Sequence, residues 1–229
     1  MNILVTGANG FIGSHLIKSL PEHNVVTWNK NIGDFYLDDS INFVVHLAAL
    51  TDVRQSVENP ELYWTVNVEY SKKIFDACKN IPMVYASSSC AKEWWRSPYG
   101  TTKKTMEELA QNGHIGLRFT TVWGEGARDN MLMGKIKNKT LTYKTNHIRD
   151  FIHVSDVASA IKFFIDTGTY DKKNIYDVGS GKGIKIDEYV ESLGIDVPLK
   201  EGSECESKSN VADITEMKKL GWINEINLC

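Results

Sequence analysis

The sequence has few cysteines and prolines, and no block of charge of one sign. Of its 229 residues four are Cys and five are Pro, and 26 Lys and Arg stand against 29 Asp and Glu, for a formal net charge of −3. The cysteines form neither a Cys-x-x-Cys pair nor a cluster at zinc spacing, so we expect reduced thiols and no metal site. Because no basic patch is present, nucleic acid is not an implied partner.

Long apolar runs are also lacking. No stretch reaches the ~18 residues that a membrane helix needs. The first apolar run, Asn2–Thr6, follows Met1 directly and leaves no room for a secretory signal. We therefore expect a cytoplasmic protein with no membrane partner. A chain of this length with 42% hydrophobic residues can bury one sizeable core, which predicts a single domain over residues 1–229.

Short apolar runs rich in β-branched residues alternate with helical patterns along the chain. Strands that alternate with helices predict an α/β fold with a parallel sheet covered on both faces. The expected strands are 2–6, 25–28, 43–47, 83–86, 115–119 and 175–178, and the expected helices are 11–20, 62–78, one that carries Tyr99, and 154–164. Residues 29–42 are too few for a full crossover helix with its loops, so an abbreviated connection is expected there.

Three glycines, Gly7, Gly10 and Gly13, follow the first expected strand and open the first expected helix. Glycines there permit a sharp turn and a close approach to a pyrophosphate, whose charge the helix N-terminus favours. The context therefore predicts a dinucleotide site. Asn29 and Lys30 stand where an acidic residue would bind the adenosine ribose, so the cofactor is NAD or NADP.

Tyr99 and Lys103 are four residues apart in the run Ser97-Pro98-Tyr99-Gly100-Thr101-Thr102-Lys103. This spacing places both on one helical face, where the ammonium group would favour the phenolate and lower the tyrosine pKa below its usual ~10. Ser97 as N-cap and Pro98 at the first helical position would place the pair near the positive end of the helix. Such a tyrosine could exchange a proton with a sugar hydroxyl while a nicotinamide exchanges hydride.

These runs together resemble the extended short-chain dehydrogenase/reductases, the nucleotide-sugar epimerase/dehydratase family. The runs that carry the similarity are Thr6–Leu16, His46–Ala49, Asp52–Arg54, Ser56–Pro60, Asn67–Val68, Val84–Ser89, Tyr99 with Lys103, Arg149–Val157, Tyr176–Gly181, Val211–Asp213 and Leu220–Trp222. The resemblance implies a Rossmann-type doubly wound parallel sheet with a small C-terminal substrate-binding lobe. The cofactor-binding core would span about residues 1–120 and 150–178, and the lobe about 121–149 and 179–229, with residues beyond about 200 closing the substrate side.

The resemblance also implies catalytic roles. Tyr99 and Lys103 match the catalytic pair, and Lys103 would also contact the cofactor ribose. Ser88 is the better match to the catalytic serine, and Ser89 is the alternative. Cys90 follows Ser88 by two residues, as the acid/base cysteine does in GDP-fucose synthases; the alternative is an inert, buried thiol.

Further residues are assigned to the cofactor and the substrate. The glycine pattern and the resemblance place at the cofactor Gly7, Asn9, Gly10, Phe11, Ile12, Gly13, Asn29, Lys30, Asp34, Phe35, Leu47, Ala48, Ala49, Asn67, Tyr99 and Lys103. At the substrate, Arg149 would bind the diphosphate, a role that suits a guanidinium fork. Its alternative is a surface pairing with Asp150 or Asp156. Asn130 and Thr121 complete the substrate set, and His153 and Asp156 are expected to be structural.

The resemblance implies an NAD(P)-dependent nucleotide-sugar epimerase whose partner is a nucleoside-diphosphate sugar. Alternatives are an NADP-dependent nucleotide-keto-sugar reductase similar to GDP-fucose synthases, and a non-catalytic cofactor-binding regulatory protein. The loop from Ser89 to Tyr99 is shorter than the family usually has, and its Trp94–Trp95 pair either covers the site or forms a dimer or partner surface. A homodimer through the Tyr99 helix and the helix at 62–78 is implied by the resemblance alone.

Overall fold

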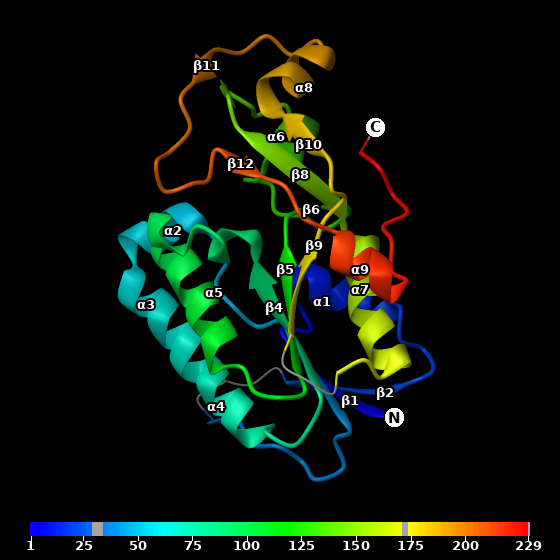
Figure 1. Cartoon of the computed structure of the whole chain (residues 1–229). Helices are drawn as coiled ribbons and strands as arrows, with labels where there is room; N and C mark the ends of the chain where they lie inside the picture. The colour runs from blue at the N-terminus through cyan, green and yellow to red at the C-terminus, as the bar shows by residue number, and fades with distance from the viewer. Residues whose placement is uncertain (29–33, 171–173, 229) are drawn as a thin grey trace.

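A parallel sheet of six strands forms the centre of the molecule (Figure 1). The computed structural model describes residues 1–28, 34–170 and 174–228. The strands lie in the order β2-β1-β3-β4-β5-β9, and every neighbouring pair is parallel. They are β1 (Asn2–Thr6), β2 (Asn24–Trp28), β3 (Phe43–His46), β4 (Met83–Ser88), β5 (His114–Phe119) and β9 (Asn174–Val178). The strand order reverses between β1 and β3, which is where doubly wound sheets bind ligands.

Helices cover both faces of the sheet, which confirms the predicted fold class (Figure 1). On one side lie α1 (Phe11–Lys18), α7 (Val154–Thr167) and α9 (Thr215–Leu220), and on the other α2 (Val53–Glu58), α3 (Pro60–Trp64), α4 (Tyr70–Ala77) and α5 (Pro98–Leu109). Alternate strand residues supply the two cores, because successive side chains point to opposite faces. Ile3 and Val84 belong to one core, whereas Leu4 and Met83 belong to the other.

Two connections differ from regular α/β geometry. The helix expected at 62–78 runs as α3, a π-helical segment at Thr65–Glu69, and α4. Such segments occur often at functional sites. Between β2 and β3, the described residues Asp34–Asn42 contain no α-helix. That absence agrees with the abbreviated connection expected from the short interval.

A small lobe sits above the carboxyl ends of the central strands (Figure 1). Its elements are β6 (Thr121–Trp123), α6 (Leu132–Lys137), β7 (Lys144–Thr145), β8 (Ile148–His153), β10 (Gly183–Lys185), α8 (Ile186–Ser192), β11 (Leu199–Lys200) and β12 (Ser209–Asn210). Strand β8 pairs with β6, β10 and β12. Phe151, Ile186 and Val190 form the centre of the lobe's own core.

A buried carboxylate joins this lobe to the rest of the chain. Asp150, fully buried in β8, accepts hydrogen bonds from the backbone amides of Ser180 (2.8 Å), Gly181 (3.0 Å) and Ala212 (3.1 Å), and from the Ser180 hydroxyl (2.6 Å). Three segments that are distant in sequence therefore meet on one side chain.

The last helix lies on the Rossmann side rather than over the lobe. Met217 and Trp222 belong to the large core, and the Trp222 indole donates to the Ser159 hydroxyl in α7 (3.0 Å). Asp156 accepts the backbone amides of Glu225 and Ile226, both at 3.0 Å. His153 caps α7 by accepting the amide of Ser155, so both residues have structural partners. None of the helices in the described residues has the length and apolar character to cross a membrane.

Candidate active site

The glycine turn packs directly against the end of strand β3. Gly7 has a φ of +71°, and a Cβ there would lie 2.7 Å from the amide nitrogen of Ala48, so only glycine fits. A Cβ on Gly13 would lie 2.3 Å from the carbonyl oxygen of Gly7. Gly10 begins α1 without a side-chain cap. This tight turn before a helix N-terminus that no side chain caps fits the pyrophosphate of a dinucleotide.

Two other segments border this turn. The His15 ring and the carbonyl of Glu125 are hydrogen-bonded (2.9 Å), which places the loop after β6 against α1. Phe11 and Asn9 lie at the turn, where Phe11 packs on the His15 ring and Asn9 is exposed. Ile12 and Leu47 pack on the large core, while Ala48 and Ala49 remain half-buried at the end of β3. The predicted cofactor residues of these segments thus lie around one turn.

Asn67 ties the strand-end loop to the helix that carries Tyr99. This fully buried side chain accepts the amide of Leu50 (2.8 Å) and donates to the Leu50 carbonyl (2.9 Å) and the Thr102 hydroxyl (3.1 Å). Its polar groups are therefore bonded to protein atoms, and the structure gives it a positioning role. These hydrogen bonds of Asn67 connect residues 47–50, which pack against the glycine turn, to helix α5.

The predicted contacts to the adenosine are only partly described. Phe35 packs edge-on against Trp28, with ring centroids 5.1 Å apart, and Asp34 is exposed beside it. Asn29 and Lys30 lie outside the described residues.

Tyr99 and Lys103 occupy the first turns of α5, as the sequence predicts. The helix begins at Pro98, and the Ser97 hydroxyl caps it by accepting the Gly100 amide (3.1 Å). The Tyr99 amide donates to the buried Ser56 hydroxyl (3.1 Å), which anchors α5 on α2. The two reactive side chains are 6% and 1% exposed, respectively, so both are held in a low-dielectric environment.

The prediction of a lowered tyrosine pKa is wrong for this structure. Burial raises the pKa of Tyr99 well above its ordinary value, and the opposing effects of a hydrogen bond to Ser88 and of the charge on Arg128 are smaller. Lys103 does not reverse this effect because its ammonium points elsewhere. Its Nζ donates to the carbonyl of Ala86 (2.7 Å) and lies 5.9 Å from the Tyr99 ring centroid. Burial lowers the pKa of Lys103 to about 8.

The three serines at the end of β4 have different partners. Ser87 donates to the carboxylate of Glu107 (2.6 Å), which is fully buried and accepts two hydrogen bonds of 2.7 Å from Arg118. Ser88 hydrogen-bonds Tyr99, and its hydroxyl accepts the Cys90 amide (3.2 Å). Ser89 starts a 3-10 turn, Ser89–Ala91. The geometry therefore brings Ser88, rather than Ser89, to the tyrosine.

Cys90 lies beside this group as a protonated thiol. Burial raises the pKa of its thiol, and the hydrogen bond with Ser88 offsets only part of that effect. A thiol with a raised pKa is a poor nucleophile but remains able to donate a proton.

Arg149 has neither of its alternative partners, Asp150 or Asp156. Its guanidinium donates to the Glu206 carboxylate (3.0 Å) and to the carbonyls of Ser207 (2.8 Å) and Ile148 (3.0 Å). Thr121 is half-buried at the start of β6, and Asn130 is exposed in the turn before α6. The structure therefore brings Arg149, but not Asn130, into a described side-chain cluster.

Sequence reasoning missed three charged residues around this site. Arg128, after β6, acts on the pKa of both Tyr99 and Tyr63 through its charge. Arg54 and Glu206 form an ion pair (2.9 Å) across a separation of 152 residues. Arg54 stands within a run that resembles the family, which was a usable signal, whereas no motif marks Glu206.

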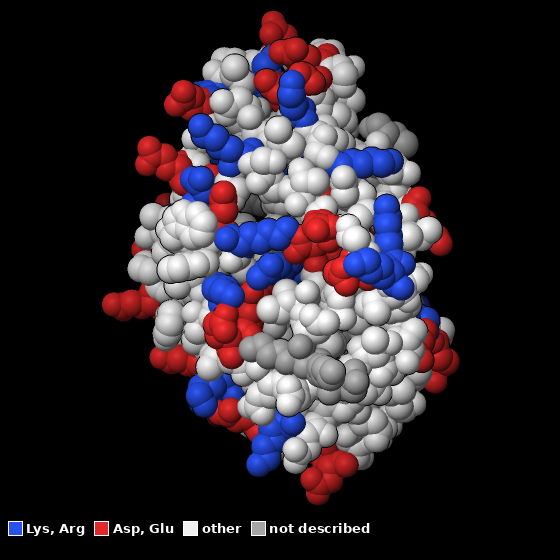
Figure 2. All heavy atoms as spheres, viewed as in Figure 1, with Lys and Arg blue, Asp and Glu red and all other residues white. Residues whose placement is uncertain are grey.

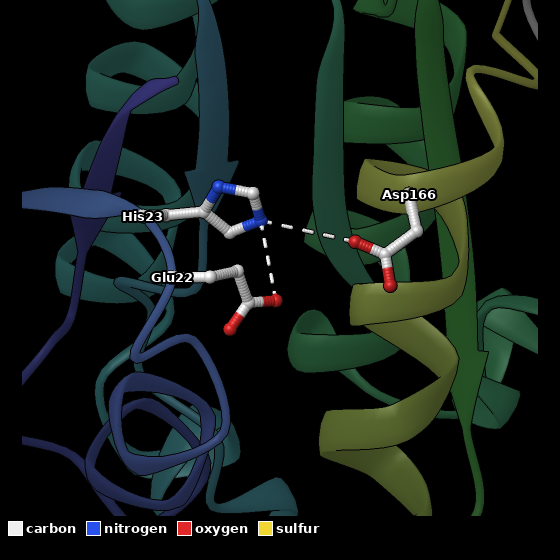
Figure 3. Close-up of side chains that lie close together, drawn as sticks. All are labelled: Glu22, His23 and Asp166. Atoms are coloured by element: carbon white, nitrogen blue, oxygen red, sulfur yellow. Dashed lines mark ion pairs between the residues drawn. The ribbon is translucent and has the colours of Figure 1, made fainter.

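One group in the described residues has ligand types that could hold a metal ion, and it lies away from this site. The group is Glu22, His23 and Asp166 (Figure 3). The His23 Nε2 atom is 3.5 Å from a Glu22 oxygen and 3.8 Å from an Asp166 oxygen. Lys162 already pairs with both carboxylates. Both acids are exposed; Glu22 and His23 lie between α1 and β2 and Asp166 lies in the last turn of α7, so the group is separate from Tyr99 and Lys103.

The fold and the site together define a Rossmann-type dinucleotide-binding enzyme with a buried Tyr/Lys pair. A model of the NAD dependent epimerase/dehydratase family matches residues 3–179. The chain belongs to this family, which confirms the predicted membership. The family's dependence on NAD also confirms the predicted nicotinamide dinucleotide cofactor.

Individual relatives are similar to this protein over nearly the whole chain. A putative UDP-glucose 4-epimerase of Methanocaldococcus jannaschii is 30% identical over 291 residues, which cover 99% of this chain and 94% of the relative. Protein CapI of Staphylococcus aureus is 28% identical and covers 93% of this chain and 91% of its own. The structure of MoeE5 in complex with UDP-glucose and NAD superposes with a TM-score of 0.86 at 27% identity, covering 100% of this chain and 95% of that one.

The alignment with the archaeal relative shows that this chain is shorter internally. The aligned stretch has 291 positions, whereas the chain has 229 residues and is 99% covered. The difference must consist of segments that the relative carries and this chain lacks. The six-stranded sheet and the Tyr99/Lys103 helix are nevertheless present.

Proposed function

We propose that this protein epimerises a nucleoside-diphosphate sugar, and that the first substrates to test are UDP-sugars. The observation that carries the proposal is the group of Ser88, Tyr99 and Lys103 at the carboxyl end of the sheet. The names of the two relatives, a putative UDP-glucose 4-epimerase and a MoeE5 complex with UDP-glucose and NAD, support the substrate class.

Four sets of residues would hold the cofactor: the turn from Gly7 to Gly13, the N-terminus of α1, the end of β3 and Lys103. When bound, oxidised NAD supplies a hydride acceptor and a positively charged ring. Tyr99 takes the proton of the sugar hydroxyl that is oxidised, and Ser88 hydrogen-bonds the same oxygen. Because a nearby positive charge lowers the pKa of a phenol, Tyr99 becomes a better base when such a charge approaches it. The epimerisation would be complete, with no net oxidation, once hydride re-adds to the opposite face of the oxidised carbon and Tyr99 returns its proton to the oxygen.

Lys103 would support this step as a group that can exchange a proton. With a pKa of about 8, it is mostly protonated at pH 7 but close to its titration. A lysine in this state can both donate and accept a proton near neutral pH.

A nucleotide-keto-sugar reductase is the second candidate function, favoured by Cys90. Its protonated thiol lies beside Ser88 and could donate a proton to the oxygen of the carbonyl group being reduced, while the carbon would take hydride from the reduced cofactor. Turnover of this kind would consume one reduced cofactor per sugar, whereas epimerisation would consume none.

The test is to incubate the protein with NAD and, in turn, UDP-glucose, UDP-glucuronate and UDP-N-acetylglucosamine. Sugar isomers are followed by NMR and the cofactor by absorbance. The proposal expects an isomerised sugar without net cofactor reduction. Tyr99→Phe should abolish turnover and retain cofactor binding. Stoichiometric NADPH oxidation on a keto-sugar would establish the reductase instead, and cofactor binding without any reaction would leave a non-catalytic protein.

We also propose that a second copy covers the aromatic surface beside α5. Trp64, Trp94 and Trp95 are 43%, 44% and 62% exposed, and a surface pocket of about 360 Å³ opens beside Trp64 and Trp95. Such a patch favours an interface. Light scattering should give the mass of a dimer, and Trp95→Glu should give a monomer. A monomeric wild-type protein would refute the dimer.

A further inference from the structure

Two arginines from opposite sides of the molecule converge on one carboxylate. The Arg54 Nε atom, on α2, donates to one oxygen of Glu206 at 2.9 Å, and the Arg149 Nη2 atom, on β8, donates to the other at 3.0 Å. Each oxygen of the Glu206 carboxylate is thus held by one guanidinium group. Guanidiniums paired in this way are suited to an anion with several oxygens.

Further basic side chains lie near this place although the chain is net negative. Arg54 also donates to the Tyr143 hydroxyl (3.1 Å), and the ammonium groups of Lys135 and Lys200 lie 5.9 and 4.8 Å from the Tyr143 ring centroid. Arg54 and Arg149 thus contact Glu206 directly, and Lys135 and Lys200 lie one side chain further away, on Tyr143. Figure 2 shows basic and acidic side chains gathered where the small lobe meets the Rossmann core. Such a field attracts an anion.

The cluster adjoins the catalytic group. The charge of Arg149 lowers the pKa of the Cys90 thiol, and the charge of Glu206 raises it, although burial has the largest effect on that pKa. The Cys90 amide donates a hydrogen bond to the Ser88 hydroxyl, and Ser88 hydrogen-bonds Tyr99. A group bound between the two arginines would therefore be near the reacting sugar.

We propose that Arg54 is a second ligand of the diphosphate that the family resemblance assigns to Arg149, and that Glu206 is the counter-ion that this diphosphate displaces. The inference rests on the proposed function for the identity of the anion. Residues 203–207, which carry Glu206, form a strap that holds this counter-ion between the two arginines. Arg149 and Arg96 also hold this strap through the carbonyls of Ser207 (2.8 Å) and Glu204 (3.4 Å).

Displacement is favourable because the diphosphate carries more charge than the carboxylate. One carboxylate offers two oxygens and a single negative charge to the two guanidiniums. A diphosphate offers more oxygen atoms and more negative charge. The strap is partly accessible to solvent, because the Glu206 side chain is 21% exposed and that of Arg54 is 53% exposed. Glu206 can therefore move into water when it leaves.

The test is to measure UDP and uridine binding by calorimetry on the NAD-loaded, full-length protein. Glu206→Gln removes the competing charge and should tighten UDP binding by about tenfold, because hydrogen bonds to charged groups contribute about 1.5–3 kcal/mol. Uridine, which lacks phosphate, should bind equally to both proteins. Glu204→Gln is the matched control: its residue is exposed in the same strap, and it should change neither affinity.

A second variant tests the arginine. Arg54→Gln in the Glu206→Gln background should weaken UDP binding by about tenfold and leave uridine unchanged. If this double variant fails to fold, Arg54→Lys in the same background keeps the charge and removes the fork, and UDP should still bind more weakly.

Two results would overturn the inference. If Glu206→Gln leaves UDP binding unchanged or weakens it, Glu206 is not a displaced counter-ion. If neither Arg54 variant weakens UDP binding, Arg54 is not a phosphate ligand. Both results are independent of turnover. UDP binding that responds to these residues, without any epimerised sugar, would refute the proposed function and leave this inference standing.

Discussion

Replacing Lys103 by methionine should stabilise the protein at neutral pH while it abolishes turnover. Burial lowers the pKa of Lys103 from its ordinary 10.5 to about 8. Methionine has a similar length and carries no charge. Because the Lys103 side chain is 1% exposed, solvent does little to screen the cost of its ammonium group. A residue that the chemistry needs is thus one that folding disfavours.

The magnitude follows from the two pKa values. One pKa unit corresponds to roughly 1.36 kcal/mol, so the difference of about 2.5 between the two pKa values corresponds to about 3 kcal/mol. The lost hydrogen bond to the Ala86 carbonyl costs about 1 kcal/mol. The net gain of Lys103→Met at pH 7 is therefore about 2 kcal/mol, which raises the melting temperature by roughly 4–8 °C for a chain of this size.

The sign of the pH dependence separates this cause from better packing. Below pH 8 the lysine is protonated in both the folded and the unfolded chain, so the folded wild-type protein carries the whole penalty. Above about pH 10.5 neither form is protonated, and the penalty is gone. Between these values the wild-type protein gains stability as the pH rises. The advantage of the variant should therefore fall to near zero at about pH 9.5.

The assay is urea unfolding of the cofactor-free protein at several pH values from 7 to 9.5. Lys72→Met is the control, because Lys72 is an exposed lysine paired with Asp76, and its loss should cost no more than about 0.5 kcal/mol. A Lys103→Met protein less stable than wild type at pH 7 would refute the reasoning. A stability difference that does not change with pH would refute it as well.

Three further predictions follow from the site and the lobe. Ser88→Ala should lower kcat by about 10²-fold or more, whereas Ser89→Ala should change it little, in steady-state assays of epimerisation; equal losses would remove the distinction. Glu107→Gln, which breaks a buried pair with Arg118, should cost about 3–5 kcal/mol by urea unfolding, and a loss under 1 kcal/mol would show that the pair contributes little. Asp150→Ala should open the junction of the small lobe and speed its limited proteolysis, and an unchanged digest would contradict the role given to this carboxylate.

Local sequence signals placed Tyr99 and Lys103 correctly in the first turns of a helix. Ser97 caps α5, Pro98 is its first residue, and four residues of spacing put Tyr99 and Lys103 on one face. The alternation of strands and helices likewise gave the parallel sheet. The helix start depends on residues near one another in the chain, and the sheet, although its strands pair over long separations, is indicated by a local pattern of alternating strands and helices that a single sequence shows directly.

The pKa of Tyr99 could not be obtained in that way. The four-residue spacing places Lys103 near Tyr99, but it does not show that the phenol is buried. Nor does it show that the Lys103 ammonium donates to the carbonyl of Ala86 in β4. The sequence already favoured Ser88 over Ser89, and the structure adds the physical reason: Ser88 hydrogen-bonds Tyr99, whereas Ser89 begins a 3-10 turn.

The sequence by itself determined the fold class, the glycine turn and the positions of the Tyr/Lys pair, because each is set by local backbone preference and periodicity. Only the tertiary structure decided the electrostatics of the site. The Arg54, Arg149 and Glu206 cluster joins α2, β8 and a segment near the C-terminus. Packing of the whole chain brings these three residues together. The effect of a charged group on pKa and stability depends on its burial and its partners, and both are set by that packing.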